Sequence, residues 1–173
     1  MHIIQMITII VSLKLNQMVT RIIYKTKGPV LIPVMEDKYK FNDFINSLEN
    51  GGDLTVILKG QKMHTLSSLY DEFTVDLSFP NYFGRNLDAF EECINDLSWL
   101  PKNNYIVGIN DVLELLSEEK NEKLISFIDI LKNAGNNWNH PKDKTKVAKP
   151  FHVLLQFEEK NKIEFKKKFG PFI

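Results

Sequence analysis

Short apolar runs recur along the chain, separated by longer stretches in which apolar residues return at helical spacing. We expect strands at 30–34, 54–58, 105–109 and 151–157, and the middle two are compact apolar runs typical of buried strands. Pro33 cannot donate a backbone hydrogen bond, which places the first strand at a sheet edge. Because helical stretches separate the strands, we exclude hairpins and expect parallel pairing through helical crossovers.

Two helices are expected before residue 80. Apolar residues repeat at helical spacing over 41–48, and Asn50-Gly51-Gly52 ends that helix. Thr65 is expected to cap a second helix, which ends before Pro80.

A further helix is expected in the last third of the chain. Ser117 caps it and Gly135 ends it. The Asn-, Lys- and Pro-rich residues 136–150 indicate a loop, and a Lys-rich tail follows the last strand. These elements together predict an α/β protein with a small sheet between helices.

The first 13 residues are strongly apolar and leave three interpretations open. They form a strand covered by the fold, an amphipathic tail, or translated sequence upstream of a start at Met18. The stretch is too short to span a bilayer as a helix, and it lacks the positive start and cleavage site of a secretory signal. We therefore expect a cytoplasmic protein that does not bind a membrane.

The charge of the chain is unevenly distributed. The 173 residues are 43% apolar, which is ordinary globular composition, and their formal net charge is zero. However, residues 63–140 carry a net charge of −8, and the two ends together carry +8. The zero net charge therefore does not exclude an electrostatic partner.

The sequence contains no recognisable motif for catalysis or metal binding. The four histidines are scattered without ligand spacing, and we find no Gly-rich phosphate loop or nucleophile elbow. Cys93, the single cysteine, falls on the apolar side of a predicted helix, which favours a buried thiol over a nucleophile. We expect no enzymatic activity, no metal and no cofactor.

The segment 86–97 is expected to form an amphipathic helix capped by Asn86. Its apolar residues fall on one side of a helical wheel, and Asp88, Glu91, Glu92 and Asp96 fall on the other. Like charges three and four residues apart destabilise a helix, and no lysine on that side relieves them. This face is either an ordinary solvated surface or a binding surface for a cationic partner.

The loop before this helix favours the second interpretation. Residues 80–86 place Tyr82, Phe83 and Gly84 directly before the acidic face. At least one of the two aromatic residues is expected in the core. An exposed tyrosine beside carboxylates is a composition typical of binding hot spots.

The stretch from Phe79 to Phe90, FPNYFGRNLDAF, resembles the signature of the barstar family of intracellular inhibitors of secreted barnase-type ribonucleases. Residues 58–63 and 66–73 resemble the family's first strand, turn and helix, and 96–101 and 151–156 resemble segments of its longer members. The resemblance implies a barstar-like layered fold with three core parallel strands. It also implies three regions: an N-terminal strand–helix extension (1–52), a barstar-like domain (53–157) and a Lys-rich tail (158–173).

The resemblance further implies a mechanism in which the acidic helix and its preceding loop plug the active site of the nuclease. The partner would be a secreted or effector-type ribonuclease bound 1:1 by a monomer, and nucleic acid would be repelled. The resemblance assigns partner binding to nine residues: Tyr82, Gly84, Asn86, Leu87, Asp88, Glu91, Glu92, Asn95 and Asp129. Asp129 is the nearest match to an acidic residue that the family carries on the next helix.

Some of these positions depart from the family pattern. Glu92 stands where barstar has an aspartate, Glu91 replaces an aromatic residue, Asn95 replaces a threonine, and Arg85 replaces a glutamate. The changes indicate a different cognate toxin. The alternative is a protein-interaction module whose partner is not a nuclease.

Overall fold

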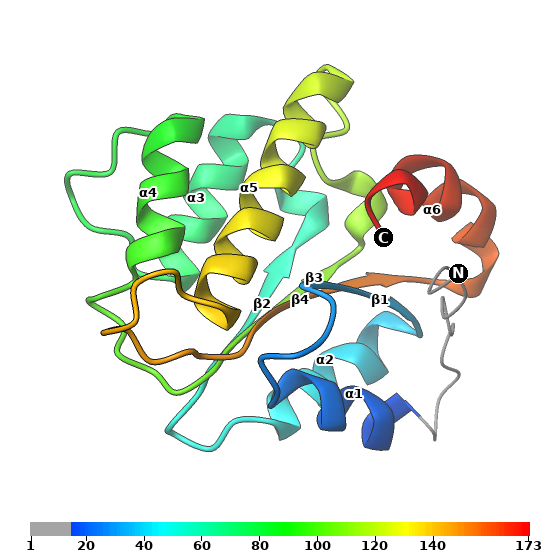
Figure 1. Ribbon diagram of the computed structural model, residues 1–173. Helices are drawn as coiled ribbons and strands as arrows, with labels where there is room; N and C mark the ends of the chain where they lie inside the picture. The colour runs from blue at the N-terminus through cyan, green and yellow to red at the C-terminus, as the bar shows by residue number, and fades with distance from the viewer. Residues whose placement is uncertain (1–14) are drawn as a thin grey trace, which may run out of the picture.

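Four parallel strands form one sheet in the order β1-β4-β3-β2 in the computed structural model, which describes residues 15–173 (Figure 1). β1 (Leu31–Met35) pairs with β4 (Phe151–Phe157), β4 with β3 (Tyr105–Asn110), and β3 with β2 (Leu54–Lys59). The predicted α/β fold with a small parallel sheet is confirmed. The apolar segment 1–13, with its three interpretations, lies outside the described residues.

The position of each strand in the sheet sets its burial. β3 and β4 lie in the centre and are buried along their whole length. β1 is an edge strand, as Pro33 predicts. The strand expected at 54–58 is present, but it is buried only at Leu54 and Leu58, because β2 is the other edge and residues 55–57 are half-buried.

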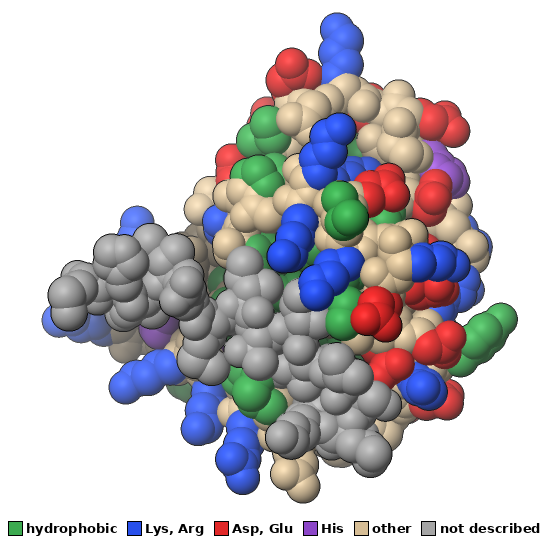
Figure 2. All heavy atoms as spheres, turned by 90° about the vertical axis from the view of Figure 1, so that its right-hand side faces the viewer, with side chains coloured by type: hydrophobic (Ala, Val, Ile, Leu, Met, Phe, Trp, Pro, Cys, Tyr) green, Lys and Arg blue, Asp and Glu red, His purple; other side chains and the backbone are tan. Residues whose placement is uncertain are grey.

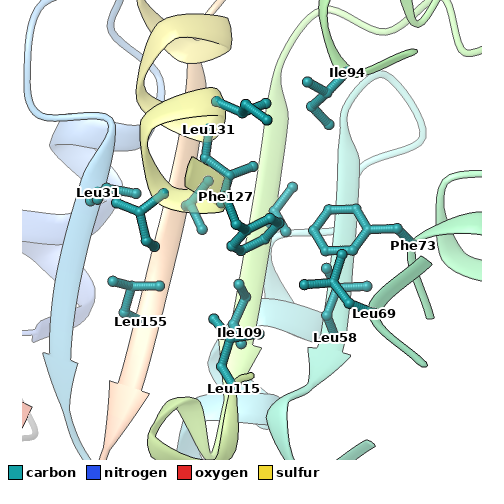
Figure 3. Close-up of a cluster of buried hydrophobic side chains, with 14 of the residues drawn as sticks. Leu31, Leu58, Leu69, Phe73, Ile94, Ile109, Leu115, Phe127, Leu131 and Leu155 are labelled. Atoms are coloured by element: carbon teal, nitrogen blue, oxygen red, sulfur yellow. The ribbon is translucent and has the colours of Figure 1, made fainter. Parts of the chain in front are cut away.

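Helices cover both faces of the sheet. α3 (Leu66–Asp76), α4 (Leu87–Asp96) and α5 (Asn121–Asn139) lie on one face, and α1 (Leu15–Ile23) and α2 (Lys38–Ser47) lie on the other (Figure 1). The larger core fills the three-helix face, where Phe73 and Phe127 meet Leu58 and Leu155 of the sheet (Figure 3). This packing fixes the position of α4 relative to the sheet.

The predicted helix starts are correct at two of the three capped helices. Thr65 caps α3 by accepting a hydrogen bond from the Ser68 amide, and Asn86 caps α4. The expectation that Ser117 caps α5 is wrong, because the helix begins at Asn121. The Ser117 hydroxyl instead lies 2.7 Å from His64 Nδ1 and is engaged there.

The expectation that Gly135 ends α5 is also wrong. The helix continues to Asn139, so residues 136–139 are helical and the loop is shorter than predicted. A Cβ atom at Gly135 would lie 2.3 Å from Val30 Cγ1, far inside contact distance. Glycine is therefore required by the close approach of α5 to the chain entering β1.

The Lys-rich C-terminal segment 158–173 folds onto the rest of the protein. It contains α6 (Lys162–Phe169), and Phe165 stacks on Phe157 of β4 with ring centroids 3.8 Å apart. Lys168 donates hydrogen bonds to the carbonyls of Leu113 and Leu115, and burial lowers the pKa of its ammonium group. The face that carries α6 shows lysines interspersed with acidic side chains (Figure 2). No helix among residues 15–173 is both long and apolar enough to cross a membrane.

Replacing Gly135 tests the close contact between α5 and Val30. Alanine raises helix propensity by about 1 kcal/mol, yet we expect Gly135→Ala to lower the free energy of unfolding by about 1–3 kcal/mol, because its methyl group meets Val30. Urea unfolding followed by circular dichroism measures the change.

The matched control is the double variant Gly135→Ala/Val30→Ala, compared with Val30→Ala alone. Val30→Ala removes the methyl groups at 2.3 and 2.7 Å and leaves only Cβ, 3.1 Å from the new side chain, so Gly135→Ala should cost much less in that background than in the wild type. A stabilising effect of Gly135→Ala in the wild-type background would contradict the contact.

Candidate acidic binding surface

α4 presents a row of carboxylates to solvent because its opposite side is packed in the core. Phe90, Cys93 and Ile94 are buried. The Phe90 ring lies 4.9 Å from Phe73 and 5.5 Å from Phe127, measured between centroids, which fixes the rotation of the helix. The exposed side carries the four acidic residues predicted from the sequence: Asp88, Glu91, Glu92 and Asp96.

These four carboxylates have no cation paired with them among the described residues. Asp96 accepts a hydrogen bond from the Ser98 hydroxyl, whose donor is neutral. The helix dipole helps Asp88 in the first turn and gives less to Glu92 one turn later. The four carboxylates therefore repel one another, and a cation supplied by a partner would relieve this repulsion.

The loop before α4 divides its two aromatic residues between core and solvent. Phe83 packs edge-on against Tyr70 and Phe79, with ring centroids 5.5 and 5.1 Å away. Tyr82 is 76% exposed. The turn closes through a hydrogen bond from the Phe83 amide to the Pro80 carbonyl. An exposed aromatic ring thus lies on the loop that leads into the acidic helix.

Arg85 ties this loop to α3. Its Nη2 atom lies 2.9 Å from Asp71 Oδ1 and donates to the Ser67 carbonyl at 3.1 Å. The residue has φ of +51°, a left-handed conformation that a non-glycine residue adopts at some cost. The sequence interpretation treated Arg85 only as a reversed charge and missed this contact. Its partners lie 14 and 18 residues earlier, and no local spacing marks them.

Several predicted site residues hold the start and end of α4 in place. Asn86 Oδ1 accepts a hydrogen bond from the Ala89 amide at 2.9 Å, and its Nδ2 donates to the Gly84 carbonyl. Leu87 is half-buried against the larger core. Asn95 is half-buried and accepts a hydrogen bond from Asn137 of α5.

Asp129 lies apart from the other predicted residues. It is exposed on α5, two positions after Phe127, which packs on Phe90 of α4. Two positions correspond to about 200° around a helix, so Asp129 faces away from α4. Its part in the binding surface stays a prediction.

A hollow of about 410 Å³ lies beside the first turn of α4. Asp88 borders it together with Arg85 and with Lys123 of α5, a residue that the sequence pattern did not associate with this helix. No ion pair joins either cation to the Asp88 carboxylate. The hollow thus holds two cations beside Asp88, and the other three carboxylates of the row lie outside it on the exposed side of α4.

Comparison with known proteins identifies the family to which this chain belongs. The sequence model described as "Barstar (barnase inhibitor)" matches residues 54–156, more than half of the chain. The chain belongs to the barstar family. A protein of Bacillus subtilis (strain 168) named "Putative ribonuclease inhibitor YrdF" is 35% identical over 78 residues, covering 39% of this chain and 86% of the relative.

The barstar match runs from the start of β2 to Gln156, one residue before the end of β4, and contains α3, α4 and α5. The acidic row and the loop at 79–86 therefore lie inside the family region. β1, α1, α2 and α6 lie outside it, although β1 belongs to the same sheet.

Cys93 and His152, both buried among the described residues, are not arranged as a nucleophile and a base. Burial and the nearby carboxylates of Asp96 and Glu92 raise the pKa of the Cys93 thiol, which disfavours the nucleophilic thiolate. His152 is fully buried and lies 2.9 Å from two backbone carbonyls, which occupies both ring nitrogens. In residues 15–173 no cluster of His, Cys, Asp and Glu is arranged to hold a metal ion.

The cap of α4 can be tested by changing Asn86. Asn86→Ala removes the acceptor for the Ala89 amide, so we expect the free energy of unfolding to fall by about 1 kcal/mol. Asn86→Asp retains an acceptor and should stay close to wild type. Denaturant unfolding measures both, and equal losses in the two variants would contradict the capping role.

Proposed function

We propose that this barstar-family protein inhibits a basic ribonuclease of the barnase type by inserting α4 and the preceding loop into its active site. The observation that carries the proposal is a row of four carboxylates that pair with no cation of residues 15–173 and that follow the loop carrying the exposed Tyr82 ring. The protein acts by binding alone, as a monomer in a 1:1 complex, and it protects the cytoplasm in which it resides.

The carboxylates act by imitating the phosphates of RNA. A ribonuclease active site binds phosphate through cationic side chains, and Asp88 and Glu92, one helical turn apart, offer two anions along one line. The acidic surface speeds the encounter with a basic protein through long-range attraction. The same charge repels RNA itself, so the surface recognises the enzyme and not its substrate.

Tyr82 and the residues around the helix start supply the apolar part of the contact. The Tyr82 ring can be buried against the nuclease at small conformational cost, because few rotatable bonds must be fixed. Gly84, Asn86 and Leu87 line the approach, and Glu91 and Asn95 extend the contact along α4. We retain Asp129 as an outlying contact reached by a large partner.

The departures from barstar at Glu92 and Arg85 set specificity. Glu92 has one more methylene than the aspartate of barstar, so its carboxylate reaches farther into a cationic site. The Arg85–Asp71 contact uses the arginine charge within the protein, which keeps that cation from pairing with Asp88. Among barnase-type enzymes, the cognate nuclease is therefore one whose phosphate-binding cations lie deeper.

Removing two carboxylates tests the proposed site. Asp88→Ala/Glu92→Ala should weaken inhibition of a susceptible ribonuclease by at least about a hundredfold, because the nuclease cations lose their desolvated partners. Cleavage of a fluorogenic RNA substrate by a panel of barnase-type ribonucleases, titrated with the full-length chain, measures inhibition and selects the enzyme that the wild type inhibits.

The matched control is Asp43→Ala/Glu49→Ala, which removes the same charge from the α2 side of the sheet. Both residues are exposed, so inhibition should change less than about threefold. Full inhibition by Asp88→Ala/Glu92→Ala would contradict the site. A wild-type chain that inhibits no member of the panel would contradict the ribonuclease partner and favour a non-nuclease interaction module.

A further inference from the structure

A cleft of about 680 Å³ lies at the C-terminal end of α4, where the segment 141–149 folds past the ends of α4 and α5. This segment is the orange loop that follows α5 in Figure 1. Asn95 and Asp96 of α4 form one wall of the cleft. The cleft therefore adjoins the acidic row at the end opposite Tyr82.

The cleft has an apolar floor and lip. Trp138 of α5 is half-buried in it and donates its indole hydrogen to the Ile94 carbonyl at 2.9 Å, which fixes the ring. Pro141 lies beside it, and Val147 at the lip is 78% exposed. An apolar side chain inserted here would cover both Trp138 and Val147.

The rim of the cleft carries cations that have no acidic partner among the described residues. Lys142 and Lys146 are exposed and form no ion pair there. Asp143, between them, accepts hydrogen bonds from the amide and hydroxyl of Thr145. These hydrogen bonds, with a smaller contribution from the nearby charge of Lys146, lower the pKa of its carboxyl group. Lys149 donates to the Lys102 carbonyl and is also held within the protein. Two cations thus remain available for an external carboxylate.

The cleft and the acidic row are close enough for one bound protein to contact both. Tyr82, 76% exposed, lies before the first turn of α4, and Val147, 78% exposed, lies beyond its last turn. Ten helical residues separate the two ends, a length of about 15 Å, which one partner protein spans easily. A protein bound along the acidic row would therefore reach the cleft.

We propose that the cleft is a second docking site for the same bound protein and receives an apolar side chain flanked by a carboxylate. The proposal rests on the proposed function and adds a chemical requirement to the partner: a basic patch for the acidic row, with an acidic–apolar segment beside it. A basic patch alone would be repelled by Lys142 and Lys146. The cleft therefore selects among basic ribonucleases by what lies next to their active sites.

Reversing the rim charges separates this proposal from general electrostatic attraction. Lys142→Glu/Lys146→Glu makes the whole chain more acidic, which by itself speeds association with a basic enzyme. We expect the opposite outcome, a dissociation constant for the inhibited ribonuclease raised by about tenfold, because the flanking carboxylate of the partner is now repelled. Surface plasmon resonance with the full-length chain measures the rates.

The matched control is Lys166→Glu/Lys167→Glu on α6, which makes the same charge change on a helix outside the cleft. It should leave affinity unchanged or slightly improved. A similar or tighter dissociation constant for Lys142→Glu/Lys146→Glu would overturn the cleft proposal. The effect of Asp88→Ala/Glu92→Ala in the same assay reports separately on the acidic row.

The occupant is identified by a photocrosslinking amino acid placed at Val147. We expect the crosslinked ribonuclease peptide to contain an apolar residue next to Asp or Glu. Crosslinking only to a Lys- and Arg-rich peptide would overturn the charge assignment. Wild-type binding to a single-stranded RNA oligonucleotide that Lys142→Glu/Lys146→Glu abolishes would assign the rim to nucleic acid and would also overturn the proposal.

Discussion

The packing of Phe90 determines which side of α4 meets the solvent. Its ring lies within 6 Å of the rings of Phe73, Phe79 and Phe127, and it is fully buried. An α-helix places opposite faces about 180° apart, so burial of one face commits the acidic residues to the surface. The core therefore fixes the position of the carboxylate row. The free energy gained by burying the aromatic cluster offsets the repulsion between the carboxylates.

Contacts with α3 and α5 hold the two ends of the binding surface. The Arg85–Asp71 contact fastens the loop that carries Tyr82 to α3, and the Asn137–Asn95 and Trp138–Ile94 hydrogen bonds fasten the end of α4 to α5. Both ends of the acidic row are thus fixed before any partner binds. A preorganised surface loses little conformational entropy on binding, which favours tight association.

Much of this arrangement follows from local patterns in the sequence. Apolar runs predict the strands, and the caps at Thr65 and Asn86 together with the two-sided character of 87–96 predict α3, α4 and the acidic row. Other features depend on contacts between residues far apart in the chain and could not be predicted from local patterns. Gly135 has the appearance of a helix stop, yet it makes room for Val30, more than 100 positions earlier. The Arg85 contact and the cleft beside Trp138 are likewise tertiary and have no local signature.

In the proposed function, one contiguous surface, from the loop at 79–86 along α4, binds a basic ribonuclease. Chemical-shift mapping of the isotope-labelled full-length chain, free and bound to the inhibited ribonuclease, tests it most directly. We expect the largest shifts between Tyr82 and Asp96, with α2 and α6 nearly unchanged. Largest shifts on α2 or α6, with the amides of α4 unmoved, would contradict it.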